Sequence, residues 1–240
     1  MECNPLRNYM RERDLTDHVF LRRVLSHIEK HALFEHRFFQ AFSDGRLTIG
    51  DVGVWAKQRL FSSQRFAYFL GVFLSHLPDG PAKQVFIRQK SEEEGDGNPE
   101  KAHSKYLERL ICALGVSSQD LDAETMLPGT CDFVGTFMRI SCEGDILKGM
   151  SMYGFGEAVI AMEMTLLLEG LDTIPGLLPE DKEYCSKHAL IDEHHAAELL
   201  DVLWPYLKNS SDEDRAWRGL VEILDARKGF YDGIVSVIGI

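Results

Sequence analysis

The stretch ILKGMSMYGFGEAVIAMEMTLLL, residues 146–168, is the most apolar part of the chain. Three charged residues interrupt it: Lys148, Glu157 and Glu163. A helix that spans a bilayer needs about 18 consecutive residues with few or no charges. We therefore expect residues 145–171 to form a helix of the protein core.

The remainder of the chain has helical periodicity, and no segment alternates with the period of two that is typical of strands. Turn sequences of Gly, Pro and Asp separate the periodic segments, and Thr48 and Asn98 are suited to cap two of them. The expected helices cover residues 15–32, 48–77, 81–94, 98–114, 130–142, 145–171, 180–207 and 212–237. We predict an all-α bundle of seven or eight helices that forms one domain over residues 1–240.

Composition limits the partners of the protein. Of 240 residues, 45% are apolar, which predicts a packed core. The net charge is -12, and since an acidic surface repels phosphate, nucleic acid is not an expected partner. The N-terminal residues do not resemble a signal peptide, and no membrane association is expected. Five cysteines without a Cys-x-x-Cys pair argue against a disulfide framework or a structural zinc site, and favour a reducing cytoplasm.

Candidate metal ligands lie on the expected helix 180–207. His188, Asp192 and His195 have the spacing i, i+4 and i+7, which places them within about 60° of one another on a helix surface. Imidazole combined with carboxylate suits iron or manganese. A solvated polar face is the alternative, and His194 is expected to be such a surface residue because it points away from the other three.

A further carboxylate, Glu157, lies inside the apolar stretch. A buried carboxylate is unfavourable unless it is paired or bound to a metal, so either a metal ligand or a buried ion pair is expected here. Glu163 lies about 240° further around the same helix and cannot share a site with Glu157.

The segment EEEGDGNPEKAH, residues 92–103, combines a run of acidic residues with a glycine-containing break and His103. Charge runs of this kind are usually solvated helix ends. The break, however, would allow a carboxylate at the end of one helix to face the imidazole on the next. Taken together, the chain offers three carboxylates and three imidazoles on four helical segments, which is how helical bundles build di-iron sites.

The order of these residues resembles the haem-oxygenase-like diiron oxidases and oxygenases, which share their fold with thiaminase II and the pyrroloquinoline quinone synthase proteins. The segments FEHRFF (34–39), GRLT (45–48) and WAKQ (55–58) are similar to the opening of that fold superfamily. Its metal-binding branch carries a Glu before a Gly-containing break and a His, a Glu on a later helix, and then His-x3-Asp-x2-His. By this resemblance the metal ligands are Glu93, His103, Glu157, His188, Asp192 and His195.

For the first ligand, Glu92, Glu94 and Asp96 compete with Glu93. Some relatives take an additional carboxylate from the preceding long helix. Residues 55–77 contain none, and Gln58 and Gln64 are the nearest candidates.

The resemblance implies two ferrous ions, dioxygen as co-substrate and a small organic substrate, such as an amino acid or a related metabolite. N-oxygenation, desaturation, C–C cleavage and decarboxylation all occur in the family. An external electron donor and a homodimer are compatible with it, although the dimer rests on analogy of fold alone.

One branch of the family makes para-aminobenzoate from its own side chains, using tyrosines near the cofactor. This chain keeps Tyr184 one turn before His188, but has Phe39 and Gly156 where that branch would have tyrosines. The self-sacrificing reaction is therefore not expected here. Glu157 and Tyr184 are the expected catalytic residues.

Arg139 and Tyr153 are candidate substrate contacts. Arg139 could bind a substrate carboxylate through its planar fork, with a surface ion pair as the alternative, while an aromatic residue such as Tyr153 could simply pack in the core.

Two other functions are compatible with the sequence. One is a metal-free enzyme of the thiaminase type, with Cys131 or Cys142 as nucleophile. The other is a helical protein that binds a partner and has no catalytic role.

Overall fold

The computed structural model describes residues 4–240, and all regular elements in that range are helical. They are α1 (Pro5–Glu12), α2 (Val19–Glu29), α3 (Arg37–Ser43), α4 (Ile49–Leu74), α5 (Pro81–Glu93), η1 (Pro99–Lys101), α6 (His103–Ala113), α7 (Ser118–Asp122), α8 (Pro128–Cys142), α9 (Ile146–Leu171), η2 (Pro179–Lys182), α10 (Glu183–Leu203), η3 (Trp204–Tyr206) and α11 (Ser210–Ile238), where η marks a 3₁₀ helix. The predicted all-α class is confirmed. The predicted number of seven or eight helices is wrong, because the described range contains eleven α-helices.

Short helices account for the difference. In α1, the side chain of Asn4 accepts hydrogen bonds from the backbone N–H groups of Leu6 and Arg7, and Pro5 takes the first position, so the cap rather than a long apolar stripe begins the helix. Helices α3 and α7 have only seven and five residues. Such segments are too short to show helical periodicity in the sequence.

Two boundaries also differ from expectation. Asn98 caps η1 rather than a long helix, and Ala102 is extended with ψ 141°, so α6 begins only at His103. The segment expected as one helix over 180–207 is divided into η2, α10 and η3. Its last turn contains Pro205, which has no N–H to continue the helical hydrogen bonds.

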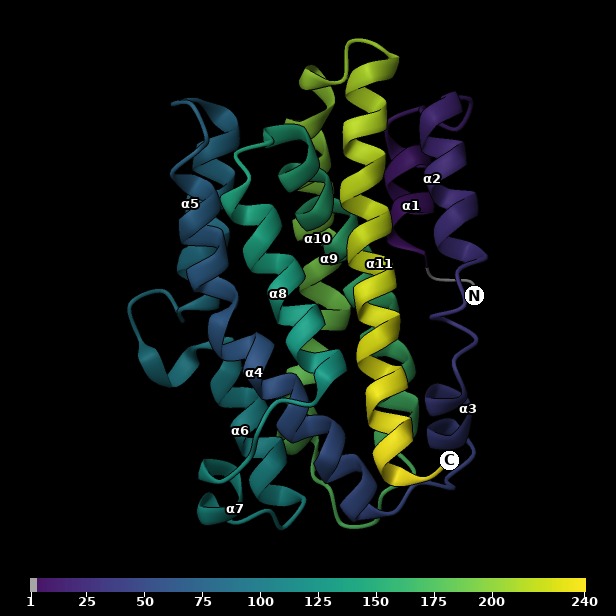
Figure 1. Ribbon diagram of the computed structural model, residues 1–240, viewed down its shortest axis with the longest axis vertical. Coiled ribbons are helices and arrows are strands. Elements are labelled where there is room, and N and C mark those ends of the chain that lie inside the picture. Colours follow the sequence, from purple (N-terminus) through teal and green to yellow (C-terminus); the bar gives the residue numbers. More distant parts are fainter. Residues whose placement is uncertain (1–3) are drawn as a thin grey trace.

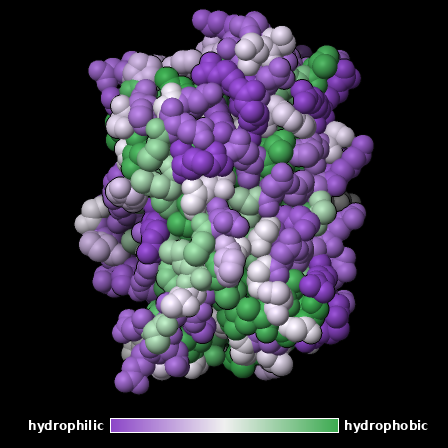
Figure 2. Space-filling view, viewed as in Figure 1, coloured by the Kyte–Doolittle hydropathy of each residue, from purple (hydrophilic) through white to green (hydrophobic). Residues whose placement is uncertain are grey.

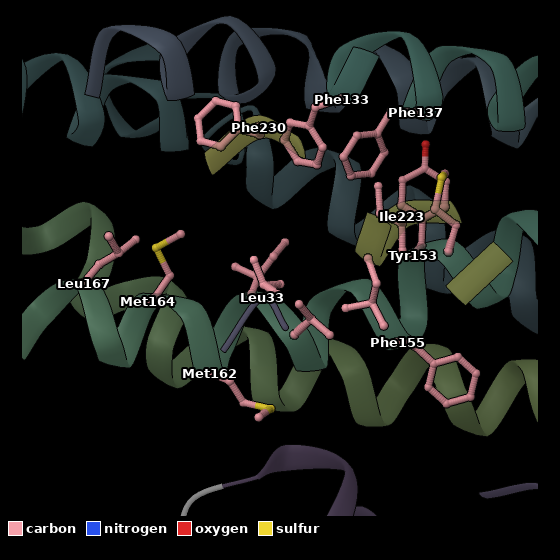
Figure 3. Packing of buried hydrophobic residues seen from close by; sticks show 14 of the residues in the cluster. Leu33, Phe133, Phe137, Tyr153, Phe155, Met162, Met164, Leu167, Ile223 and Phe230 are labelled. Carbon is pink, nitrogen blue, oxygen red and sulfur yellow. The ribbon is translucent and has the colours of Figure 1, made fainter. Parts of the chain in front are cut away.

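Helix α9 lies at the centre of the bundle and is buried along most of its length. It packs against α10, α11 and α3, while α4 packs against α5, α6 and α8. In Figure 1, α9 runs behind α8 and α11, and most helices run along the long axis of the molecule. Figure 3 shows the core beside α9, where Phe133, Phe137 and Phe230 face Met164 and Leu167.

Within residues 4–240, no helix is long and apolar enough to cross a membrane. The face in Figure 2 is mainly hydrophilic, with small apolar areas between the polar side chains. Cys185 is a buried free thiol, and the other cysteines of the described range, Cys112, Cys131 and Cys142, are exposed free thiols. Cys3 lies outside the described residues.

Helices α9 and α11 approach closely at Gly219. A Cβ atom at this position would lie 2.2 Å from the backbone oxygen of Lys148, and backbone cannot move aside as a flexible side chain can. The glycine therefore sets the distance between the two helices.

We predict that Gly219→Ala destabilises the protein by about 1–3 kcal/mol, because the added methyl group forces α11 away from α9. Gly229→Ala is the matched control: it lies on the same helix, has no atom within 4 Å of its added Cβ, and should gain up to about 1 kcal/mol from helix propensity. Urea unfolding followed by circular dichroism compares the two. Equal stability of both variants would contradict the close approach.

Candidate metal centre

The six predicted ligands come from four helices and lie together in the structure. They form two groups, and within each group one ligand atom from each residue lies within 4.8 Å of the others. The first group is Glu93, His103 and His188, and the second is Glu157, Asp192 and His195. Each group offers three ligands, which is enough to hold one metal ion with open positions left for other ligands.

The α10 residues share one buried face, as their spacing predicts. His188, Asp192 and His195 are 6%, 0% and 2% exposed. His194, which directly precedes His195 in the sequence, is exposed, and its Nε2 lies 3.8 Å from Oε1 of Glu198. The solvated-face alternative for the three is therefore excluded, and His194 is the surface residue that the sequence predicted.

The glycine-containing break joins the last residue of α5 to the first residue of α6. Gly95, Asp96 and Gly97 all have positive φ, at 85°, 52° and 82°, and a Cβ on Gly95 would lie 2.2 Å from the oxygen of Asn98. This sharp reversal brings Glu93 beside His103. Glu93 Oε1 and His103 Nδ1 are 3.0 Å apart.

The carboxylates that compete with Glu93 have other partners. Glu94 pairs with Lys90, and Asp96 accepts a hydrogen bond from Ser91. Glu92 lies 2.7 Å from Nε2 of His195, although its side chain is 41% exposed. Of these four acidic residues, Glu93 is the one that joins a three-residue group in the described structure.

His188 is oriented by a backbone hydrogen bond. Its Nδ1–H donates to the carbonyl oxygen of Tyr184 at 2.7 Å, which leaves Nε2 with a free lone pair. A fixed tautomer of this kind is typical of metal-binding imidazoles. The hydroxyl of Tyr184 in turn accepts a hydrogen bond of 3.0 Å from Nε of Arg59.

The electrostatics of both groups favour the binding of cations. Burial raises the pKa of Glu157 to about 7; the charge of Glu93 adds to this rise, while those of His195, Arg227 and His103 oppose it. Burial, together with the charges of Glu157 and Glu93, raises the pKa of Asp192 well above its usual range. Burial and the nearby charge of His103 lower the pKa of His188 to about 3, so this imidazole is neutral. A neutral imidazole is the form that binds metal.

Several ligand atoms also lack hydrogen-bond partners. Both carboxylate oxygens of Asp192 are buried without a partner among residues 4–240. The same holds for Nδ1 of His103, which is near Glu93 but not aligned for a hydrogen bond with it. Unpartnered buried groups are unfavourable, and a pair of divalent ions would satisfy them. The donor set of carboxylates and imidazoles fits iron or manganese.

A cavity of about 20 Å³ adjoins the two groups, and its wall includes Glu93, Glu157, His188 and Tyr184. A groove of about 780 Å³ on the outside, between α4, α5 and η1, shares Ser63 and Glu93 with this cavity. The outer groove therefore lies next to the cavity, at Ser63 and Glu93.

Helix α4 supplies no additional ligand. Gln58 donates hydrogen bonds to Glu124 and to the carbonyl oxygen of Thr125, and Gln64 bonds Glu108 on the surface. Four residues of α4 line the cavity beside the candidate ligands, namely Arg59, Ser62, Ser63 and Phe66, and none of them is a carboxylate.

The structure does not bring Arg139 and Tyr153 to this cavity. Arg139 pairs on the surface with Glu143 and Glu222, at 2.7 and 2.6 Å, which corresponds to the surface ion pair considered above. Tyr153 is buried, and its hydroxyl lies 2.8 Å from that of Ser141. The described residues that line the cavity include neither of them.

Sequence reasoning missed a second arginine of the cavity wall, Arg227. Its Nη1–H group donates a hydrogen bond of 2.7 Å to Glu163, which also accepts a hydrogen bond from the hydroxyl of Tyr231. This ion pair explains how Glu163 is accommodated in the apolar stretch. Arg227 follows Ile223 and Leu224 on one stripe of α11, and an arginine on an apolar stripe was the available indication.

We predict that Glu157→Gln stabilises the metal-free protein at pH 8 but not at pH 4.5. Since the folded-state pKa of Glu157 is raised from 4.5 to about 7, the folded state loses stability as pH rises through this range, by about 3 kcal/mol in total. The neutral amide does not titrate. Thermal unfolding in a chelator at both pH values measures the difference, and a variant less stable than the wild type at pH 8 would contradict it.

Glu163→Gln on the same helix is the matched control. It removes the partner of buried Arg227, so it should destabilise the protein at both pH values.

Comparison with known proteins agrees with the fold. The chain is 28% identical to the 4-aminobenzoate synthase of Chlamydia muridarum over 223 residues, 90% of each protein, and 22% identical to that of Nitrosomonas europaea over 230 residues, 92% of each. A domain of unknown function with a heme oxygenase-like fold from Shewanella denitrificans matches with a TM-score of 0.77 at 18% identity, covering 91% of both chains. A TenA homolog from Pseudomonas syringae matches with a TM-score of 0.75 at 14% identity, covering 91% of this chain and 93% of that one.

These structures confirm the haem-oxygenase-like fold that the sequence resemblance implied. Residues 54–228 match the family of iron-containing redox enzymes, and the chain belongs to that family.

Proposed function

We propose that the protein is a di-iron oxidase or oxygenase that uses dioxygen to oxidise a small organic substrate. The observation that carries the proposal is the pair of adjacent three-ligand groups, with both oxygens of the buried Asp192 left without a partner. Membership of the iron-containing redox enzymes supports iron as the metal. Glu93, His103 and His188 would hold one ion, and Glu157, Asp192 and His195 the other.

Two ferrous ions, when bound, supply two electrons to dioxygen, and an external donor would restore them. The chain itself restricts water: Phe66, Phe137 and Ile160 form an apolar part of the cavity wall. On the other side, Glu157 and Tyr184 would meet a substrate in the cavity. The hydroxyl of Tyr184 is held by Arg59, so it keeps one position beside the ligands.

The thiaminase-type alternative finds no cysteine nucleophile at this cavity among residues 4–240. Cys131 and Cys142 are exposed on α8, and the described residues that line the cavity do not include them. The likeness to a TenA homolog at 14% identity concerns the fold alone.

The relatives named 4-aminobenzoate synthase raise a second possibility, in which the product comes from the protein's own side chains. Tyr184 lines the cavity and is the residue available for such a reaction. At the other expected positions, Phe39 packs against the ring of Tyr231 at 4.6 Å, and Gly156 has no side chain. We therefore propose that the substrate is a free molecule.

We predict about two irons per chain after anaerobic loading with ferrous iron, and oxygen uptake when air is admitted. His188→Ala should remove at least one iron, because it deletes a ligand of the first group. His194→Ala, the exposed neighbour on the same helix, should keep both. Colorimetric iron analysis after desalting counts the metal. Full loading of His188→Ala, or an iron-free wild type, would refute the di-iron proposal.

We also predict that the mass of the polypeptide is unchanged after reaction with iron, dioxygen and a chemical reductant. Intact-protein mass spectrometry and peptide mapping around residue 184 make the measurement, with Tyr184→Phe as the control. Loss of side-chain mass at Tyr184 in the wild type, and none in the variant, would instead favour synthesis from the protein's own tyrosine.

A further inference from the structure

The guanidinium group of Arg227 has an unused edge beside the candidate metal ligands. Its side chain is 1% exposed and forms part of the cavity wall together with Glu157 and His188. Nη1 donates to Glu163, but Nε and Nη2 are buried without a hydrogen-bond partner among residues 4–240.

Buried N–H groups without an acceptor are unfavourable, so an acceptor from outside the chain would stabilise these two. Nε and Nη2 form one edge of the planar group, with two parallel N–H bonds. That edge matches the two oxygens of a carboxylate. Arg59 lines the same cavity and adds a second positive charge.

The charge of the loaded site also favours an anion. Two divalent ions and two arginines would bring six positive charges, against four negative charges on carboxylates that are at most 8% exposed. The arginines are Arg59 and Arg227, and the carboxylates are those of Glu93, Glu157, Glu163 and Asp192. An anionic ligand would reduce the excess positive charge in an environment where water screens it poorly.

We propose that Arg227, with Arg59 beside it, binds a carboxylate group of the substrate and so selects small carboxylic acids. This inference rests on the proposed function, since it assigns the substrate class of the same site. The carboxylate would occupy the inner cavity, and the rest of the molecule would extend past Ser63 into the outer groove.

Calorimetric titration tests this with acetate and hexanoate, each compared with its neutral amide, on metal-free protein and on anaerobic ferrous protein. Arg227→Lys keeps a positive charge for Glu163 but lacks the two-donor edge. We expect hexanoate to bind this variant at least tenfold more weakly than it binds the wild type. Arg139→Lys, which changes an arginine of the surface ion pairs, is the matched control and should bind hexanoate as the wild type does.

Equal hexanoate affinity in Arg227→Lys and the wild type would overturn the proposal. The proposal would also be overturned if neither the metal-free nor the ferrous wild type bound the acids, or if the amides bound as well as the acids. In either case, water would satisfy the N–H groups of the arginine edge. If Arg227→Lys does not fold, the double variant Glu163→Gln/Arg227→Gln removes both charges of the pair and carries the same expectation.

Iron content separates this proposal from the proposed function. Arg227 is not a ligand, so Arg227→Lys should retain as much iron as the wild type. A wild type that binds no iron would refute the di-iron centre, yet a preference of its metal-free form for acids over amides would still support the arginine site.

Discussion

The enclosure of Glu157 and Asp192 between α9 and α10 is the constraint on which the rest of the structure depends. Burial raises the pKa of both carboxyl groups, and neither oxygen of Asp192 finds a hydrogen bond in the described structure. Apolar residues of similar size would give a more stable interior. A site that retains such groups at the expense of stability is typical of function, and cations are the ligands that would relieve the unfavourable interaction.

Each ligand group combines side chains from more than one helix. Helix α10 carries three candidate ligands on one face. Glu93 and His103 come from two helix ends that meet because residues 95–97 reverse the chain with positive φ. Helices α4 and α11 then add arginines to the wall rather than further carboxylates. The candidate ligands are thus anionic where they converge, and two arginines add positive charge to the wall of the same cavity.

The sequence predicts the geometry best where a single helix determines it. The shared face of His188, Asp192 and His195 follows from the angle per residue and is buried in the structure. Glu157 is a candidate ligand because it interrupts an apolar stretch, and it too is buried. Which of the four acidic residues near position 93 lies beside His103 depends on the turn between α5 and α6. Local sequence patterns do not predict the geometry of that turn. Arg139 was a plausible carboxylate ligand by chemistry alone, but its position on the exposed side of α8 depends on the packing of α8 against α11.

The two kinds of charge in the site are coupled. In the metal-free protein, the positive charges of Arg59 and Arg227 act on the same carboxylates that would bind cations: both oppose the raised pKa of Asp192, and Arg227 opposes that of Glu157. Metal binding would transfer these carboxylates to the ions and leave the arginines with less compensating negative charge, so an anion would bind more tightly. Because coupling between two sites is reciprocal, a bound anion would in turn strengthen the binding of the metal. By this proposal, the arginine edge and the candidate ligand groups would act as one site, in which substrate and metal stabilise each other.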